Sequence, residues 1–76
     1  MLSDQDKAII ASDLGSTFVN RMVNEEATYS EFIHILTVMA HELLLTIAET
    51  ACVDETEVIN IFLGAVRNRH NATKTN

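Results

Sequence analysis

The sequence contains no proline or tryptophan, two glycines and one cysteine among its 76 residues. Proline and glycine are the residues that most often interrupt helices, so their scarcity favours long helices. A single cysteine cannot form a disulfide within the chain, and the first residues lack a basic region followed by an apolar run of the signal-peptide kind. We therefore expect a cytoplasmic protein.

Basic side chains are also scarce. The chain has 5 Lys and Arg residues against 11 Asp and Glu residues, which gives a formal net charge of -6. A surface that binds nucleic acid directly needs clustered basic side chains to contact the phosphates. The composition therefore argues against direct nucleic-acid binding. It leaves open an acidic decoy that imitates nucleic acid and blocks a nucleic-acid-binding protein.

The longest apolar stretch is FIHILTVMAHELLLTIAETAC, residues 32–52. At 100° per residue, many of its apolar side chains fall on one broad arc. This arc consists of Phe32, Ile33, Ile35, Leu36, Met39, Ala40, Leu43, Leu44, Ile47 and Ala51. We expect a central helix over about residues 29–52, with the arc packed against two flanking helices. Polar residues such as His41, Glu42 and Glu49 interrupt the stretch, so we expect no membrane contact.

A second set of residues lies on the opposite side of this helix, where a surface helix is normally charged. The set, called the outer stripe below, consists of His34, Val38, His41, Leu45, Ala48 and Cys52. Its spacings alternate between four and three residues, which is typical of a coiled-coil interface. Ile9, Val19 and Val23 form a weaker stripe on the first helix. The two stripes predict an interface with a second chain, most simply a homodimer.

The flanking segments carry helix-capping residues. Ser3 is a suitable N-cap for a helix over residues 4–24, Thr28 and Glu31 form a capping box, and Asp54 precedes a helix over residues 55–69. These patterns predict an all-α three-helix bundle, with a single domain over residues 1–70 and a disordered polar tail over residues 71–76. A chain of this size has a small core, so we expect dimerisation into a larger helical bundle.

Catalytic and metal-binding patterns are weak. Two histidines, His34 and His41, are seven residues apart, roughly 10 Å along a helix, which is too far for both to bind one ion. Cys52 lies at the negative end of the helix dipole, which disfavours a reactive thiolate. We therefore expect no enzymatic activity, no metal site within one chain and no cofactor. A metal or small-ligand site shared between subunits through His34 and His41 remains an alternative.

The sequence therefore favours a non-enzymatic helical module that forms a homodimer and that binds and inhibits or regulates another protein. The identity of that protein partner is not encoded in any motif. One alternative keeps the chain monomeric and uses the outer stripe as the docking site for an amphipathic helix of a different protein. The acidic decoy and the shared histidine site are the other two.

Overall fold

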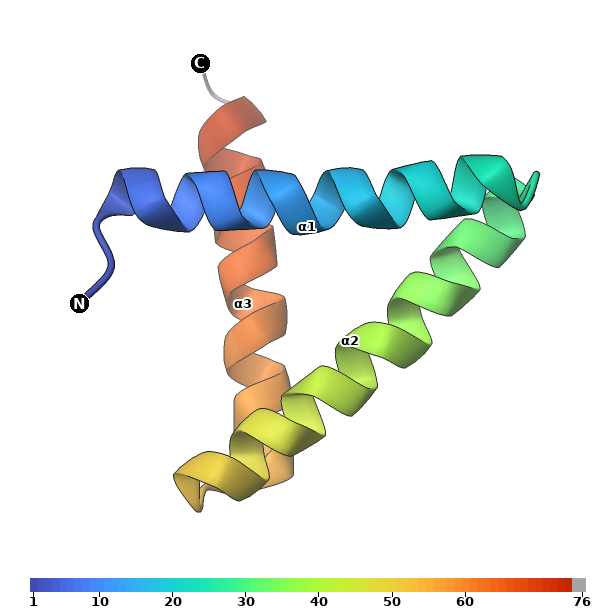
Figure 1. Cartoon of the computed structure of the whole chain (residues 1–76). Coiled ribbons are helices and arrows are strands. Elements are labelled where there is room, and N and C mark those ends of the chain that lie inside the picture. The colour runs from blue at the N-terminus through green and yellow to red at the C-terminus, as the bar shows by residue number, and fades with distance from the viewer. Residues whose placement is uncertain (75–76) are drawn as a thin grey trace. The chain divides into compact units, whose positions relative to one another are not determined.

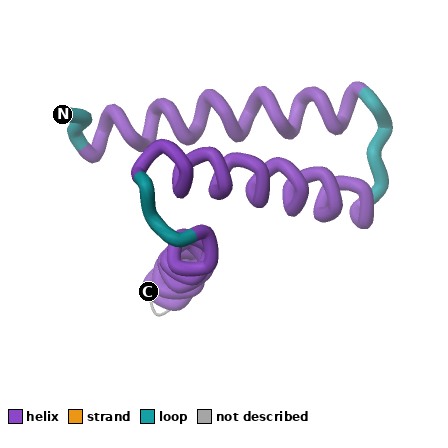
Figure 2. The backbone as a smooth tube through the Cα atoms, turned by 90° about the horizontal axis from the view of Figure 1, so that it is seen from below, coloured by secondary structure: helices purple, strands orange, loops and turns teal. Residues whose placement is uncertain are grey.

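The computed structural model describes residues 1–74 and contains the helices α1 (Asp4–Asn24), α2 (Tyr29–Ala51) and α3 (Glu55–Lys74) (Figure 1). Within these residues there is no strand. The connections are short loops, drawn in teal in Figure 2. The predicted all-α fold with three helices is confirmed, and the predicted bounds of the first helix agree with α1.

The third helix is longer than predicted. α3 continues to Lys74, five residues beyond the expected end at Arg69, so residues 71–74 of the expected polar tail are helical. No proline or glycine follows Gly64 to stop the helix, and Lys74 suits the negative end of the helix dipole. The hydroxyl of Thr73 donates a hydrogen bond to the carbonyl of His70 at 2.8 Å. The prediction for residues 75–76 lies outside the described residues.

The chain divides into two compact units, Met1–His34 and Ile35–Asn76. The division falls within α2, where the sequence predicted one domain. The first unit contains α1 and the beginning of α2, and the second contains the rest of α2 and α3. Each unit therefore contains one of the two corners between consecutive helices.

The first unit is held by contacts close to the α1–α2 corner. The rings of Phe18 and Phe32 pack edge to face, with centroids 6.1 Å apart and an interplanar angle of 82°. Met22 is buried, and Ala27 in the connecting loop is half-buried. Edge-to-face aromatic pairs contribute about 1 kcal/mol beyond the area that they bury. These side chains fix the corner between α1 and α2.

The N-terminus of α2 has the predicted capping box. The backbone N–H of Thr28 donates to Glu31 Oε1 at 2.8 Å, and the N–H of Glu31 donates to Thr28 Oγ1 at 3.2 Å. The backbone hydrogen bond from Thr28, followed by the side-chain bond, lowers the pKa of Glu31 below its ordinary value. Because the folded-state pKa is lowered, this contribution to stability is present above the unfolded-state pKa. It is lost as the pH falls through the lowered pKa.

Both α1 and α2 end in a Schellman motif. At the end of α1, the N–H of Ala27 donates to the carbonyl of Met22 and the N–H of Glu26 donates to the carbonyl of Val23. The end of α2 repeats this pattern, with bonds from Val53 to Ala48 and from Cys52 to Glu49. The motif needs a residue with positive φ, and Glu26 (φ 53) and Cys52 (φ 57) occupy these positions. Met22 and Ala48 accept the two bonds that span five residues, and they are the two buried apolar residues of the part described.

Replacing Cys52 with glycine is expected to stabilise the second unit. A residue with a Cβ atom pays roughly 1–2 kcal/mol in the left-handed conformation, whereas glycine adopts it readily. The greater freedom of glycine in the unfolded chain offsets part of this gain. We expect Cys52→Gly to raise the free energy of unfolding by about 1 kcal/mol in urea denaturation. Cys52→Ala removes the thiol but keeps the Cβ atom, so an equal gain for this control would contradict the explanation.

Candidate protein-interaction surface

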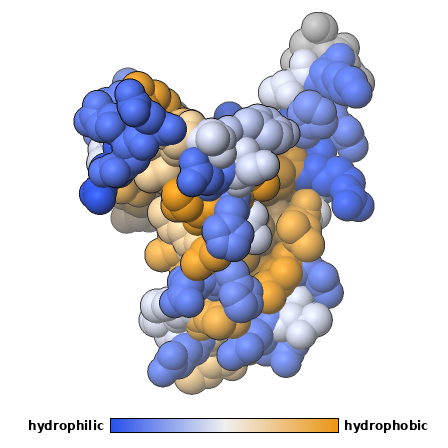
Figure 3. Space-filling view, turned by 90° about the vertical axis from the view of Figure 1, so that its right-hand side faces the viewer, coloured by the Kyte–Doolittle hydropathy of each residue, from blue (hydrophilic) through white to orange (hydrophobic). Residues whose placement is uncertain are grey.

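Most of the apolar arc predicted as core is exposed in the second unit. Leu36, Met39, Leu43 and Ile47 are called the exposed α2 stripe below, and the side chains of Leu43 and Ile47 are 56% and 53% exposed. Their spacings of three, four and four residues place them along one side of α2. Figure 3 shows hydrophobic side chains, in orange, at the surface among hydrophilic ones. Within the described part of the second unit, α3 is the only helix beside this part of α2.

The outer stripe is only partly a surface. His34, Val38, His41 and Cys52 are exposed, Leu45 is half-buried, and Ala48 is only 1% exposed. The assignment of Ala48 to an intermolecular surface was therefore wrong. The reason is local, because the chain reverses direction at the Schellman motif that includes the Ala48 carbonyl, and α3 begins shortly after it. On α1, the predicted interface residues Ile9, Val19 and Val23 are exposed.

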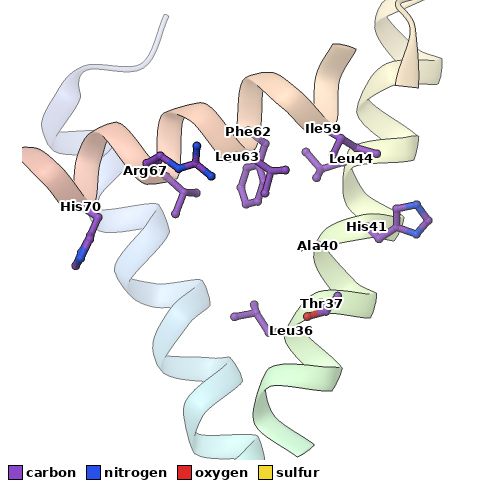
Figure 4. Close-up of a pocket in the computed structure, with 11 residues that line it drawn as sticks. Leu36, Thr37, Ala40, His41, Leu44, Ile59, Phe62, Leu63, Arg67 and His70 are labelled. Atoms are coloured by element: carbon purple, nitrogen blue, oxygen red, sulfur yellow. The ribbon is translucent and has the colours of Figure 1, made fainter. Parts of the chain in front are cut away.

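A groove of about 780 Å³ lies between α2 and α3 in the second unit. The α2 side is lined by Leu36, Thr37, Ala40, His41 and Leu44. The α3 side is lined by Ile59, Phe62, Leu63, Val66, Arg67 and His70. In Figure 4, Ile59 and Leu44 lie close together where the two helices approach, whereas Leu36 and His70 lie where they have separated. The groove is therefore a wedge that widens away from the α2–α3 corner.

The wall of this groove is apolar and exposed. Phe62, Leu63 and Val66 retain 39%, 52% and 51% of their accessible surface, and Leu36 belongs both to the groove and to the exposed α2 stripe. The stripe and the groove therefore form one continuous apolar surface. Phe62 and Val66 remain exposed because α2 and α3 diverge along this wall (Figure 4). The helical spacing of Ile59, Phe62, Leu63 and Val66 is the signal from which the groove could be found.

The charge around the groove is opposite to that of the rest of the chain. All 11 acidic side chains lie within residues 1–57 together with two basic ones, so this segment has a formal charge of 2 − 11 = −9. The other three of the 5 basic side chains, Arg67, Arg69 and Lys74, lie on α3. No acidic side chain lines the groove, and within residues 1–74 Arg67 forms no ion pair. The groove is thus an apolar site with a positive edge.

The alternative site at His34 and His41 requires two subunits, so the side chains of one chain do not test it. Among residues 1–74, no three or more His, Cys, Asp or Glu side chains are grouped so that they could hold a metal ion. His41 lies at the α2 edge of the groove, whereas His34 is not part of its lining. A site shared between two subunits through His34 and His41 stays a prediction.

The helix α2 is long and apolar enough to cross a membrane, judged by length and composition alone. Only 6% of its most apolar 18-residue window is buried, so α2 differs from the usual core helix of a soluble protein, which passes the same test but is mostly buried. His41 and Glu42 lie near the middle of this helix. A charged side chain at the centre of a bilayer costs roughly 3 kcal/mol. These two polar groups therefore disfavour insertion of α2 into a bilayer.

No protein-family model matches this chain, and no curated protein or solved structure matches it either.

Proposed function

We propose that this chain is a non-enzymatic protein-interaction module that self-associates through the exposed α2 stripe, and that the resulting homodimer binds and regulates another protein. The observation that carries the proposal is the exposure of Leu36, Met39, Leu43 and Ile47 along one side of an otherwise apolar helix. Contiguous exposed apolar surface of this kind marks protein or membrane interaction sites. A symmetric dimer places the same stripe of each chain against its copy, so that both are covered at once.

Self-association is favoured over membrane insertion by the polar groups of α2. A protein interface leaves His41 and Glu42 at its edge in water, whereas insertion forces both into the hydrocarbon region. The remaining exposed residues of the outer stripe, His34 and Val38 among them, are available in the dimer for the second protein. This division assigns self-association and partner binding to different sides of the same helix.

Thermal unfolding at different protein concentrations tests the proposal. When the folded form is a dimer, the midpoint temperature rises with protein concentration because association stabilises the folded state. We expect the midpoint temperature, measured by circular dichroism, to rise continuously as the protein concentration increases from about 1 to 100 μM. A midpoint that does not move over this range would contradict self-association. Flotation of a monomeric chain with liposomes would assign the exposed α2 stripe to a membrane instead.

A further inference from the structure

We infer that the groove between α2 and α3 is the docking site for the N-terminal half of α1 from a second copy of this chain. The inference rests on the proposed self-association and names a second contact within it. It starts from an apolar groove whose wall, including Phe62 and Leu63, is exposed, and whose edge carries Arg67 without an ion pair in the part described.

The groove has the dimensions of a helix site. Its α3 wall runs from Ile59 to His70, which corresponds to roughly 16 Å, or three turns, at 1.5 Å per residue. An amphipathic helix of three turns docks in such a groove through apolar residues spaced three and four apart. The docked helix must also pair with the positive charge at the edge of the groove. A helix face that combines apolar and acidic side chains therefore fits best.

One face of α1 has this composition. Asp6, Ile9, Ile10 and Asp13, called the acidic α1 face below, fall within about 100° of the helix circumference. Ile9 and Ile10 are 52% and 44% exposed. Asp13 lies on the opposite side of the helix from Met22, which is buried in the first unit. The acidic α1 face therefore points away from the side of α1 that packs against the beginning of α2.

Charge selects a second copy and determines its orientation. Two chains of charge -6 repel each other, so local contacts between opposite charges favour a dimer of this chain. The three basic side chains that follow residues 1–57 all lie on α3, and Arg67 is the one that lines the groove. In a symmetric dimer, α1 of each copy lies in the groove of the other, and the contact between Arg67 and the acidic α1 face is made twice.

A charge-reversal experiment on the full chain tests this placement. Arg67→Glu and Asp13→Arg each create two like-charge contacts in their own homodimer, so we expect each variant to self-associate about tenfold more weakly. An equimolar mixture restores opposite charges in both grooves of the heterodimer. We expect the mixture to associate as tightly as the native chain. Asp13 is chosen because Asp6 also accepts a hydrogen bond from the backbone N–H of Ser3.

The matched control is Arg69→Glu, which makes the same charge change on α3 outside the groove lining. We expect it to change the dissociation constant less than about threefold. The double variant with both Arg67→Glu and Asp13→Arg in one chain is expected to associate like the native chain, which shows that both substitutions are tolerated by the fold.

Four outcomes would overturn the inference. A native dimer that Arg67→Glu does not weaken places the groove outside the interface, while the proposed self-association stands. Recovery in the double variant without recovery in the mixture means that the groove holds α1 of its own chain. A mixture that remains monomeric but binds an acidic amphipathic helix of another protein assigns the groove to that partner. A native chain that is monomeric overturns the proposed function as well.

Discussion

Replacing Leu43 with glutamate is expected to convert the dimer into a folded monomer. The Leu43 side chain is the most exposed of the four in the exposed α2 stripe, so within one chain it contributes little to packing. In a symmetric dimer, Leu43 of both chains is buried in the interface. The variant loses this apolar burial and places two carboxylates in the interface instead. We expect the dissociation constant to rise at least about 100-fold.

The control for this prediction is Val38→Glu. Val38 lies on α2 about 140° around the helix from Leu43 and is 47% exposed. The substitution adds the same charge on the other side of the helix, so the dimer is expected to persist, as measured by analytical ultracentrifugation. If Val38→Glu dissociates the dimer and Leu43→Glu does not, the interface is the outer stripe. Loss of helical circular dichroism in Leu43→Glu would show that Leu43 belongs to the core of the chain.

Replacing Ala48 with leucine is expected to destabilise the second unit. Ala48 is only 1% exposed and its carbonyl accepts the hydrogen bond from Val53 that closes the α2–α3 corner. A larger side chain at a filled position forces its neighbours to move, at a cost of typically about 2 kcal/mol. The free energy of unfolding in urea is therefore expected to fall by about this amount at fixed protein concentration.

The matched control for this substitution is Ala51→Leu at the end of the same helix. Ala51 is exposed, so an added leucine side chain meets no packed neighbour, and we expect a change within about 0.5 kcal/mol. Equal effects of the two substitutions would contradict the burial of Ala48. The comparison also tests the removal of Ala48 from the outer stripe. If Ala48 were a surface residue, it would tolerate leucine as well as Ala51 does.

The elements of the fold could be predicted from the sequence because their determinants are local. The N-cap at Ser3 and the capping box at Thr28 and Glu31 are formed within three residues, and both are present. The helix α3 extends past Arg69, the end that the sequence predicts, because the residues after Arg69 are polar but include nothing that stops a helix. Polarity alone does not end a helix on the surface of a small protein.

The distribution of burial could not be predicted from periodicity. A helical wheel shows which residues share a side of α2, but it does not show which side faces α3. That side is decided by the turn after Cys52, whose positive φ directs the chain back past Ala48. With this side of α2 facing α3, Leu43 and Ile47 are exposed and the groove lies beside Phe62. A non-glycine residue in the left-handed conformation gives little warning of such a turn.

The most direct test of self-association is the mass of the native chain in solution, measured by sedimentation equilibrium at several concentrations. Self-association predicts a mass twice the 8.5 kDa of a single chain, with a shift toward the mass of one chain on dilution. A folded species of 8.5 kDa that persists at the highest concentration would contradict it. The exposed α2 stripe would then need a cover other than a second copy of this chain.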